Sequence, residues 1–309
     1  MTRLLGVEVR RYLSRRLVRV VAGLAVVGIL TGAAVMFVRS HRVDSAQARA
    51  ILQAAEAQRD AEVRACASGQ FGIRPSDVPP GLTAEQFCEQ LIGPPQVFDR
   101  SFHLTDVRGA ILGVSGILIS LALLLGASFI GAEWHHGTMT TLLTWEPRRV
   151  RVFASKIAVV AAMAFAGTVM LLALLGGLLA VVAAVRGTTV GADTTWLRGV
   201  VGIALRSATV AATAAVAGGA LASIGRNTTA GLGVAFGYLA VLEPLVRGLR
   251  PGWGPWLIEN NLATFLEGTR SPNPEFTSRS VAAAGLVVGA YALGLAAAAA
   301  AAFRARDVT

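Results

Sequence analysis

The residues of this chain that could take part in chemistry gather in one polar stretch, EWHHGTMTTLLTWEPRRVRVFASK, at residues 133–156. Lys156 is the only lysine, and the residues before it provide none of the glycines that a phosphate-binding loop requires. His135 and His136 are adjacent, so their side chains point apart on a helix and form no metal-binding pair. Neither HExxH nor GxSxG occurs. We therefore expect no catalytic residues, no metal site and no cofactor in this chain.

The same stretch has apolar residues at helical spacing. Thr138 can cap a short helix, and Pro147 must end that helix or follow it closely. Met139, Leu142 and Leu143 would then share one face of the helix. A short amphipathic helix between two spans is suited to docking into a groove on another protein.

Arg206 is a charged residue inside an apolar run, 197–224. A charge at this depth is expected to face a polar interior, to snorkel outward, or to meet an anionic part of a substrate. In the last case Arg206 would line a possible substrate path. The alternative is that the membrane-spanning helix begins only after Arg206. The sequence leaves both interpretations open.

The two cysteines, Cys66 and Cys88, lie in the same polar segment, 39–108. An oxidising exterior would favour a disulfide between them. Two free thiols are the alternative. Because no other cysteine competes, we expect the disulfide.

Six apolar runs must position these residues, and each is long enough to cross a hydrocarbon core of about 30 Å. They are residues 17–38, 109–130, 157–185, 197–224, 229–246 and 281–303. The composition agrees, because 54% of the residues are hydrophobic and only 15% are charged. We predict an all-α, polytopic membrane protein with six transmembrane helices. The fifth run is the shortest and has Glu243-Pro244 near its end.

The charges between these runs predict the orientation. If the N-terminus is cytoplasmic, the inner segments and the span ends beside them hold thirteen basic residues and four acidic ones. The basic residues are Arg3, Arg10, Arg11, Arg15, Arg16, Arg19, Arg148, Arg149, Arg151, Lys156, Arg226, Arg304 and Arg306. This is the positive-inside pattern, and six spans then place both termini in the cytoplasm. The net charge of +10 therefore reflects topology and contact with anionic lipid, and we expect no nucleic-acid partner.

Three further segments complete the predicted layout. Residues 1–16 show apolar and basic series on different helical faces, which favours an amphipathic helix in the headgroup layer. A simple basic tail is the alternative. Residues 247–280 form an outer segment with short helices, and residues 304–309 form a cytoplasmic tail.

This layout resembles the permease subunits of bacterial type-2 ABC exporters. The local match lies in residues 131–156, where the family has a glutamate, a Gly-Thr pair, a leucine pair, a proline, an arginine and a lysine. The matching residues here are Glu133, Gly137-Thr138, Leu142-Leu143, Pro147, Arg149 and Lys156. Arg226-Asn227-Thr228 resembles the family's basic turn between the fourth and fifth spans. The long first outer segment, with its two cysteines, departs from many members.

The resemblance implies a function and partners. Two permeases, either a homodimer or two related chains, assemble with two separate ATPase subunits that bind ATP and Mg. The loop 131–156 would contain a coupling helix, Thr138–Trp145, that docks on the ATPase. The expected function is export of a small amphiphile, a drug-like molecule or a lipid, across the bacterial cytoplasmic membrane. The coupling residues would be Glu133, Gly137, Thr138, Met139, Leu142, Leu143, Trp145, Pro147 and Arg149.

Two other classes of function stay open. A membrane-embedded enzyme would need His, Asp or Glu clustered at a membrane face, and the sequence has no such cluster. A sensor or assembly subunit that transports nothing would be distinguished by the absence of a co-encoded ATPase.

Overall fold

The structure is a computed structural model, and it describes residues 2–40, 45–69, 83–93, 102–135, 137–138, 144, 148–268 and 279–305. Within them, six helical stretches are long and apolar enough to cross a membrane. They are α2 (Arg16–Arg39), α5 (Val107–His135), α7 (Arg149–Arg186), α8 (Thr194–Gly225), the α9–η3–α10 stretch (Thr228–Leu249) and α12 (Val281–Ala305). Each predicted span lies within one of these stretches, so the chain is an all-α, multi-pass membrane protein.

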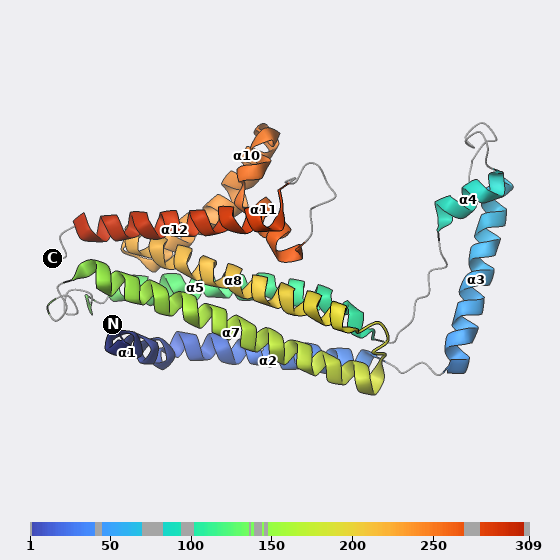
Figure 1. Cartoon of the computed structure of the whole chain (residues 1–309), viewed down its shortest axis with the longest axis horizontal. Coiled ribbons are helices and arrows are strands. Elements are labelled where there is room, and N and C mark those ends of the chain that lie inside the picture. The colour runs from blue at the N-terminus through green and yellow to red at the C-terminus, as the bar shows by residue number, and fades with distance from the viewer. Residues whose placement is uncertain are drawn as a thin grey trace.

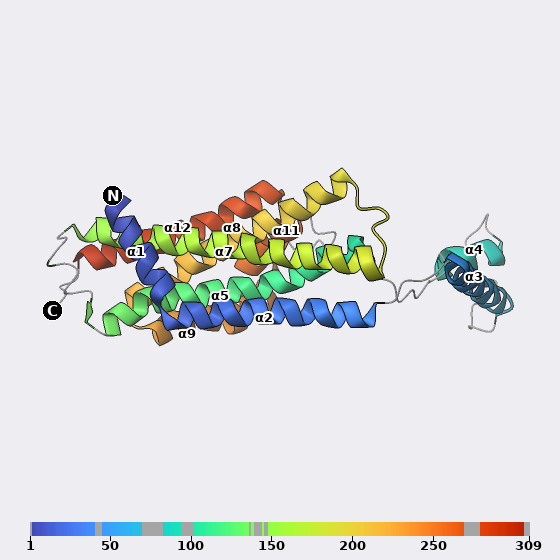
Figure 2. The same ribbon diagram turned by 90° about the horizontal axis from the view of Figure 1, so that it is seen from below.

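The spanning helices form one elongated bundle (Figure 1). The N-terminal helix α1 (Thr2–Ser14) and the last turns of α12 lie at the same end, as an even number of spans requires. We call this the terminal end and the opposite one the distal end. Seen from below, α1 runs obliquely across α7 instead of continuing the line of α2 (Figure 2). The change of direction occurs at Arg15, whose backbone is extended with φ −67° and ψ 131°.

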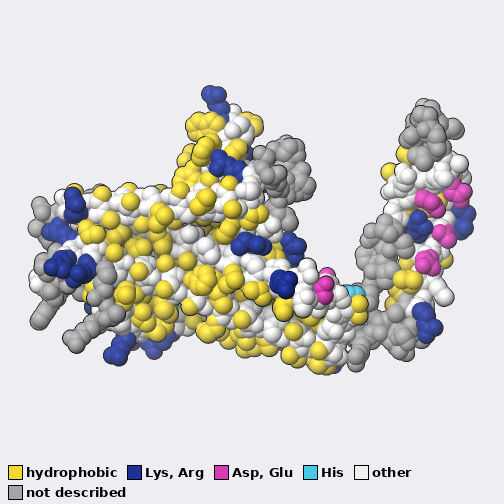
Figure 3. Space-filling view, viewed as in Figure 1, with side chains coloured by type: hydrophobic (Ala, Val, Ile, Leu, Met, Phe, Trp, Pro, Cys, Tyr) yellow, Lys and Arg dark blue, Asp and Glu magenta, His cyan; other side chains and the backbone are white. Residues whose placement is uncertain are grey.

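The core of the bundle is divided along its length. Near the terminal end, aromatic residues of α1, α5, α7 and α12 pack with alanines of α5, α7 and α8. Toward the distal end, leucines of α5 and α7 pack around Ile29 of α2 and Phe102. The remaining outward surface is largely apolar, and hydrophobic side chains cover the face of the bundle in Figure 3. A bundle that is apolar on its outside as well as inside is suited to lipid.

The closest packing in the bundle lies between α5 and α8. A Cβ added at Gly126 would collide with the backbone carbonyl of Ala215, and one at Gly218 with the carbonyl of Leu123. The backbones of α5 and α8 therefore touch directly, as small residues allow between membrane helices. The glycine pair Gly218-Gly219 is part of this close contact.

At the distal end, two backbone hydrogen bonds link the segments that flank the spans. Leu104 N–H donates to the Thr188 carbonyl and Thr188 N–H donates to the Phe102 carbonyl, both at 3.0 Å. The start of α5 is thereby bonded to the segment that follows α7.

The fifth span changes helical type part of the way along. A π-helical turn, η3 (Tyr238–Leu242), joins α9 (Thr228–Gly237) to α10 (Glu243–Leu249). Pro244 lacks the N–H that an α-helix would direct at residue 240, which explains the break in the regular ladder. The short helices η4 (Pro251–Trp256) and α11 (Ile258–Glu267) then follow, so the segment after the fifth span contains short helices.

The long segment between α2 and α5 has two helices of its own. These are α3 (Ser45–Ala67) and α4 (Ala84–Ile92), drawn apart from the bundle beyond its distal end (Figure 1). Cys66 and Cys88 form a disulfide with their Cα atoms 6.0 Å apart, and they pack against Val63 in a small core. Arg59 Nε also donates to the Gly93 carbonyl at 2.9 Å.

We expect the paired replacement Cys66→Ser plus Cys88→Ser to destabilise the α3–α4 unit by about 2–4 kcal/mol, because the bond restricts the unfolded chain. Protease digestion of α3 in membranes should then be faster, while the spans stay inserted. Mass spectrometry of alkylated, unreduced protein checks the bond itself. Alkylation of both cysteines in the native chain would contradict it.

Candidate functional site

The connection between α5 and α7 is the stretch in which the sequence places the partner-docking residues. Met139, Leu142, Leu143, Trp145 and Pro147 lie outside the residues that the structure describes. Of the others, Gly137 has a positive φ of 66°, and its N–H donates to the Trp134 carbonyl at 3.3 Å. Thr138 and Thr144 are helical and exposed. The Thr138 hydroxyl donates to the Glu133 carbonyl at 3.4 Å, and the N–H groups that Thr138 is predicted to cap lie outside the described residues. Arg149 is the first residue of α7.

Both ends of this connection are attached to one buried ion cluster. Glu133, in the last turn of α5, and Lys156, in the second turn of α7, form an ion pair with Nζ and Oε2 2.7 Å apart. Lys156 Nζ also donates to both carboxylate oxygens of Glu8 in α1, each at 3.0 Å. Glu8 and Lys156 are 0% exposed. The cluster thus joins α1, α5 and α7 at the terminal end.

Two arginines complete the cluster. Arg15 Nη2 lies 3.2 Å from Glu133 Oε1, and its Nη1 donates to the Ser128 carbonyl at 3.0 Å. Arg11 Nη1 lies 3.5 Å from Glu8 and 3.7 Å from Glu133. Burial lowers the pKa of the Arg15 guanidinium from its ordinary value, while the charge of Glu133 raises it. Two carboxylates thus face three cations.

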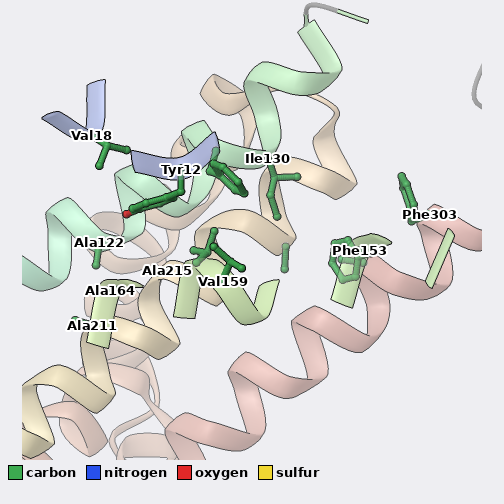
Figure 4. Packing of buried hydrophobic residues seen from close by; sticks show 14 residues of the cluster. Tyr12, Val18, Ala122, Ile130, Phe153, Val159, Ala164, Ala211, Ala215 and Phe303 are labelled. Atoms are coloured by element: carbon green, nitrogen blue, oxygen red, sulfur yellow. The ribbon is translucent and has the colours of Figure 1, made fainter. Parts of the chain in front are cut away.

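Aromatic side chains pack against these charged groups. The Phe129 ring lies 4.5 Å from the guanidinium carbon of Arg15 and 5.4 Å from Lys156 Nζ. Tyr12 packs edge-on against Phe129, with ring centroids 5.3 Å apart, and Figure 4 shows Tyr12 beside Ile130 and Val159. Burial raises the pKa of the Tyr12 hydroxyl to about 12, although the nearby Arg15 lowers it. A cation over a ring face is attracted more strongly when the pair is buried than when it is exposed.

The cluster changes the interpretation of the N-terminal helix. The sequence predicts arginines of α1 directed to headgroups, but Arg15 turns inward and Glu8 is buried. Leu5 and Val9 do pack against the core, whereas Leu13 is 49% exposed. Sequence reasoning missed the role of Glu8. The available signal was an acidic residue in a basic helix and a single lysine at the start of a span.

Glu133 therefore contacts its own chain. Its carboxylate is engaged by Arg15 and Lys156, and the residue is only 4% exposed. Removing one partner from a buried ion pair leaves an uncompensated charge, which costs about 3–5 kcal/mol. The arrangement can hold the two ends of the connection at a fixed separation against α1.

The turn between α8 and α9 packs beside this cluster. Arg226 adopts a left-handed φ of 52°, and its guanidinium carbon lies 5.1 Å from the Trp134 ring. Asn227 caps α9 by accepting the Thr229 N–H at 2.8 Å. A Cβ at Gly131 would collide with Thr228, so this turn lies directly against the end of α5. The basic turn therefore packs against the last turns of α5.

A cavity of about 340 Å³ opens among α5, α8, α9, α11 and α12. Its lining is mostly apolar, with Ser120, Thr213, Tyr238 and Tyr291 as the polar side chains. Tyr291 donates its hydroxyl to the Trp256 carbonyl at 3.0 Å. Such a composition is suited to an apolar ligand with few polar groups.

Glu243 lies a few residues after a part of the fifth span that lines this cavity. Its position near the end of a span suggests that the side chain is directed to the headgroups, but the structure shows that it is not. It is 0% exposed, and its carboxylate accepts the Glu259 N–H of α11 at 2.6 Å. Arg247 bridges the two acids, at 3.8 Å from Glu243 and 2.7 Å from Glu259. A buried carboxylate in the fifth span thus satisfies the first turn of α11, where a negative charge is favourable.

Arg206 lies inside α8, twelve residues after its first residue, so the helix does not begin after it. Its guanidinium lies against Gly268, where an added Cβ would collide with it. Gly268 follows α11 with a φ of 72°. The side chain is thus directed to the distal end of the bundle and away from the ion cluster.

Comparisons of the chain with protein-family models, with curated proteins and with solved structures gave no match.

Proposed function

We propose that this chain is the permease subunit of an ATP-driven exporter of the type-2 ABC kind. It moves a small amphiphile, a drug-like molecule or a lipid, across the bacterial cytoplasmic membrane. A separate ATPase subunit binds ATP and Mg, and a second copy or a related permease completes the transporter. The terminal end faces the cytoplasm, in agreement with the concentration of basic residues in the segments assigned to that side.

The observation that carries this proposal is the attachment of both ends of the α5–α7 connection to one buried ion cluster. Glu133 lies in the last turn of one spanning helix and Lys156 in the second turn of the next, and both are held against α1. A partner that displaces the connection therefore displaces α5, α7 and α1 together. Such a rigid attachment is suited to transmitting a conformational change from an ATPase to the spans.

The class of substrate rests on the cavity among the spans. Its lining of leucines, isoleucines and valines favours apolar molecules, and its volume of about 340 Å³ falls in the range of small-ligand sites. Because the spanning helices border it, the molecule can enter from the bilayer. This supports an amphiphile in preference to a hydrophilic solute.

The decisive test is the double replacement Leu142→Asp plus Leu143→Asp. Each new carboxylate would be buried unpaired in the proposed interface, at a cost of several kcal/mol. We expect membrane levels within about twofold of the native chain and a loss of at least about tenfold in co-purifying ATPase.

The matched control is Thr141→Asp plus Thr144→Asp. It adds the same charge to the same stretch, on the opposite face of the expected helix. This variant should retain the ATPase. Normal assembly and ATP-dependent transport by the leucine variant would show that the coupling-helix assignment is wrong.

A further inference from the structure

Two arginines from different spans meet at the distal end of the bundle. Arg108, the second residue of α5, donates from Nη2 to the Glu267 carbonyl at 2.9 Å. The Arg206 guanidinium of α8 lies against Gly268, the next residue in the chain. Glu267 and Gly268 are adjacent, so the two guanidinium groups lie against neighbouring residues. Both therefore surround the C-terminal end of α11.

Arg108 and Arg206 place two positive charges at the end of α11. Among the described residues, no carboxylate forms an ion pair with Arg108 or Arg206, although Asp106 and Glu267 are close in sequence. The Nε of Arg206 is buried and has no hydrogen-bond partner within the part of the chain that the structure describes. The end of α11 supplies only about half a negative charge, against two positive ones.

Two other arginines that are only partly exposed have acidic partners. Arg15 contacts Glu133 at the terminal end, and Arg247 contacts Glu259 and Glu243 near α11. A buried N–H without an acceptor is costly, so a missing acceptor is expected at the Nε of Arg206. Arg108 is exposed, so the position is open to a ligand from outside.

The location indicates which acceptor is missing. Ser207 Oγ accepts the hydroxyl of Ser115 at 2.8 Å, which places this part of α8 about two turns from the start of α5. The Arg206 side chain then extends outward to the level of Arg108, as long cationic side chains do near a membrane surface. Two guanidinium forks at the headgroup level match the oxygens of a phosphate.

We propose that Arg108 and Arg206 form a binding site for a phosphate group at the distal membrane surface. The group is the phosphodiester of a membrane lipid or a free phosphate ion, and the chemistry of recognition is the same for both. The site is separate from the proposed ATPase contact, which lies at the terminal end.

The test uses the full chain, purified in a neutral detergent and titrated with dioleoylphosphatidylglycerol under native mass spectrometry. Arg206→Gln and Arg108→Gln should each weaken lipid binding by about tenfold or more, because each removes a charge-assisted contact. Arg198→Gln, an exposed arginine two turns earlier in α8, should bind as the native chain does. Dioleoylglycerol, which lacks the phosphate, should not distinguish the variants.

A second titration, with inorganic phosphate and the thermal unfolding midpoint as readout, separates the two sources. If inorganic phosphate stabilises only the native chain and Arg198→Gln, and the lipid titration shows no difference among the variants, the site binds free phosphate. If Arg206→Gln does not fold, the result for Arg108→Gln decides the test, because Arg108 is exposed and its hydrogen bond goes to the Glu267 carbonyl at the surface. Binding of both probes by Arg108→Gln as tightly as by Arg198→Gln would overturn the proposal.

Discussion

Replacement of Lys156 by methionine is expected to destabilise the terminal end by about 3–5 kcal/mol. The side chain of Lys156 contacts Glu8 and Glu133 directly, and all three are buried. Methionine is unbranched and only one heavy atom shorter than lysine, but it has no charge, so Glu8 and Glu133 both lose their contact with Lys156. Arg15 still contacts Glu133, whereas Arg11 lies farther from the two carboxylates, at 3.5 and 3.7 Å. The measurement is the thermal unfolding midpoint of the purified chain, together with protease cleavage within α1.

The matched control is Arg148→Met, which removes an exposed charge eight residues earlier and should change stability little. Adding Glu8→Gln to the Lys156→Met variant should recover part of the lost stability, because one of the two buried carboxylates that have lost their contact with Lys156 is then replaced by a neutral amide. Unchanged protease resistance and an unchanged midpoint in Lys156→Met would show that the cluster does not hold α1 in place.

Gly126→Leu is expected to prevent normal packing of α5 on α8. A Cβ at Gly126 already collides with the Ala215 backbone, so a leucine forces the two helices apart. Overpacking of this kind costs about 1–3 kcal/mol in ordinary cores, and a backbone-to-backbone contact has less freedom to relax. We expect a large loss of folded protein, measured as the monodisperse fraction after extraction into detergent.

Gly113→Leu is the matched control for this substitution. Gly113 lies in the same helix, is exposed, and has no atom within 4 Å of an added Cβ. Leucine is a better helix former than glycine by several tenths of a kcal/mol, so this variant should be neutral or slightly stabilised. Equal yields from the two variants would contradict the close packing of α5 and α8.

The spans could be predicted from the sequence because a membrane helix is a local property. About twenty consecutive apolar residues suffice to define one, and polar residues mark where it ends. The six predicted runs therefore lie within the six observed stretches. Some observed helices are longer than the predicted runs: α7 begins earlier, at Arg149, and α5 ends later, at His135. The short helices after the fifth span followed from prolines and tryptophans close together in the chain.

The ion cluster could not be predicted, because its members are far apart in the chain. Glu8 and Lys156 are 148 residues apart, and Arg15 and Glu133 are 118 apart. Periodicity assigns a residue to a face of its own helix but does not say which other helix that face meets. The same limit applies to Glu243, whose partner Glu259 lies beyond the turn that reverses the chain. Pairing across such distances depends on the tertiary arrangement.

The break at Arg15 has a consequence for how the chain is made. Because α1 is held by Glu133 and Lys156, it cannot reach its final position until the ribosome has synthesised the start of α7. At about 5–20 residues per second, a separation of 148 residues corresponds to roughly 7–30 s of translation. During that interval the first span can already be inserted, while Glu8 is still solvated at the membrane surface. Docking of α1 is thus a late event of biosynthesis. It depends on insertion of the second and third spans in the correct orientation, because these spans carry Glu133 and Lys156.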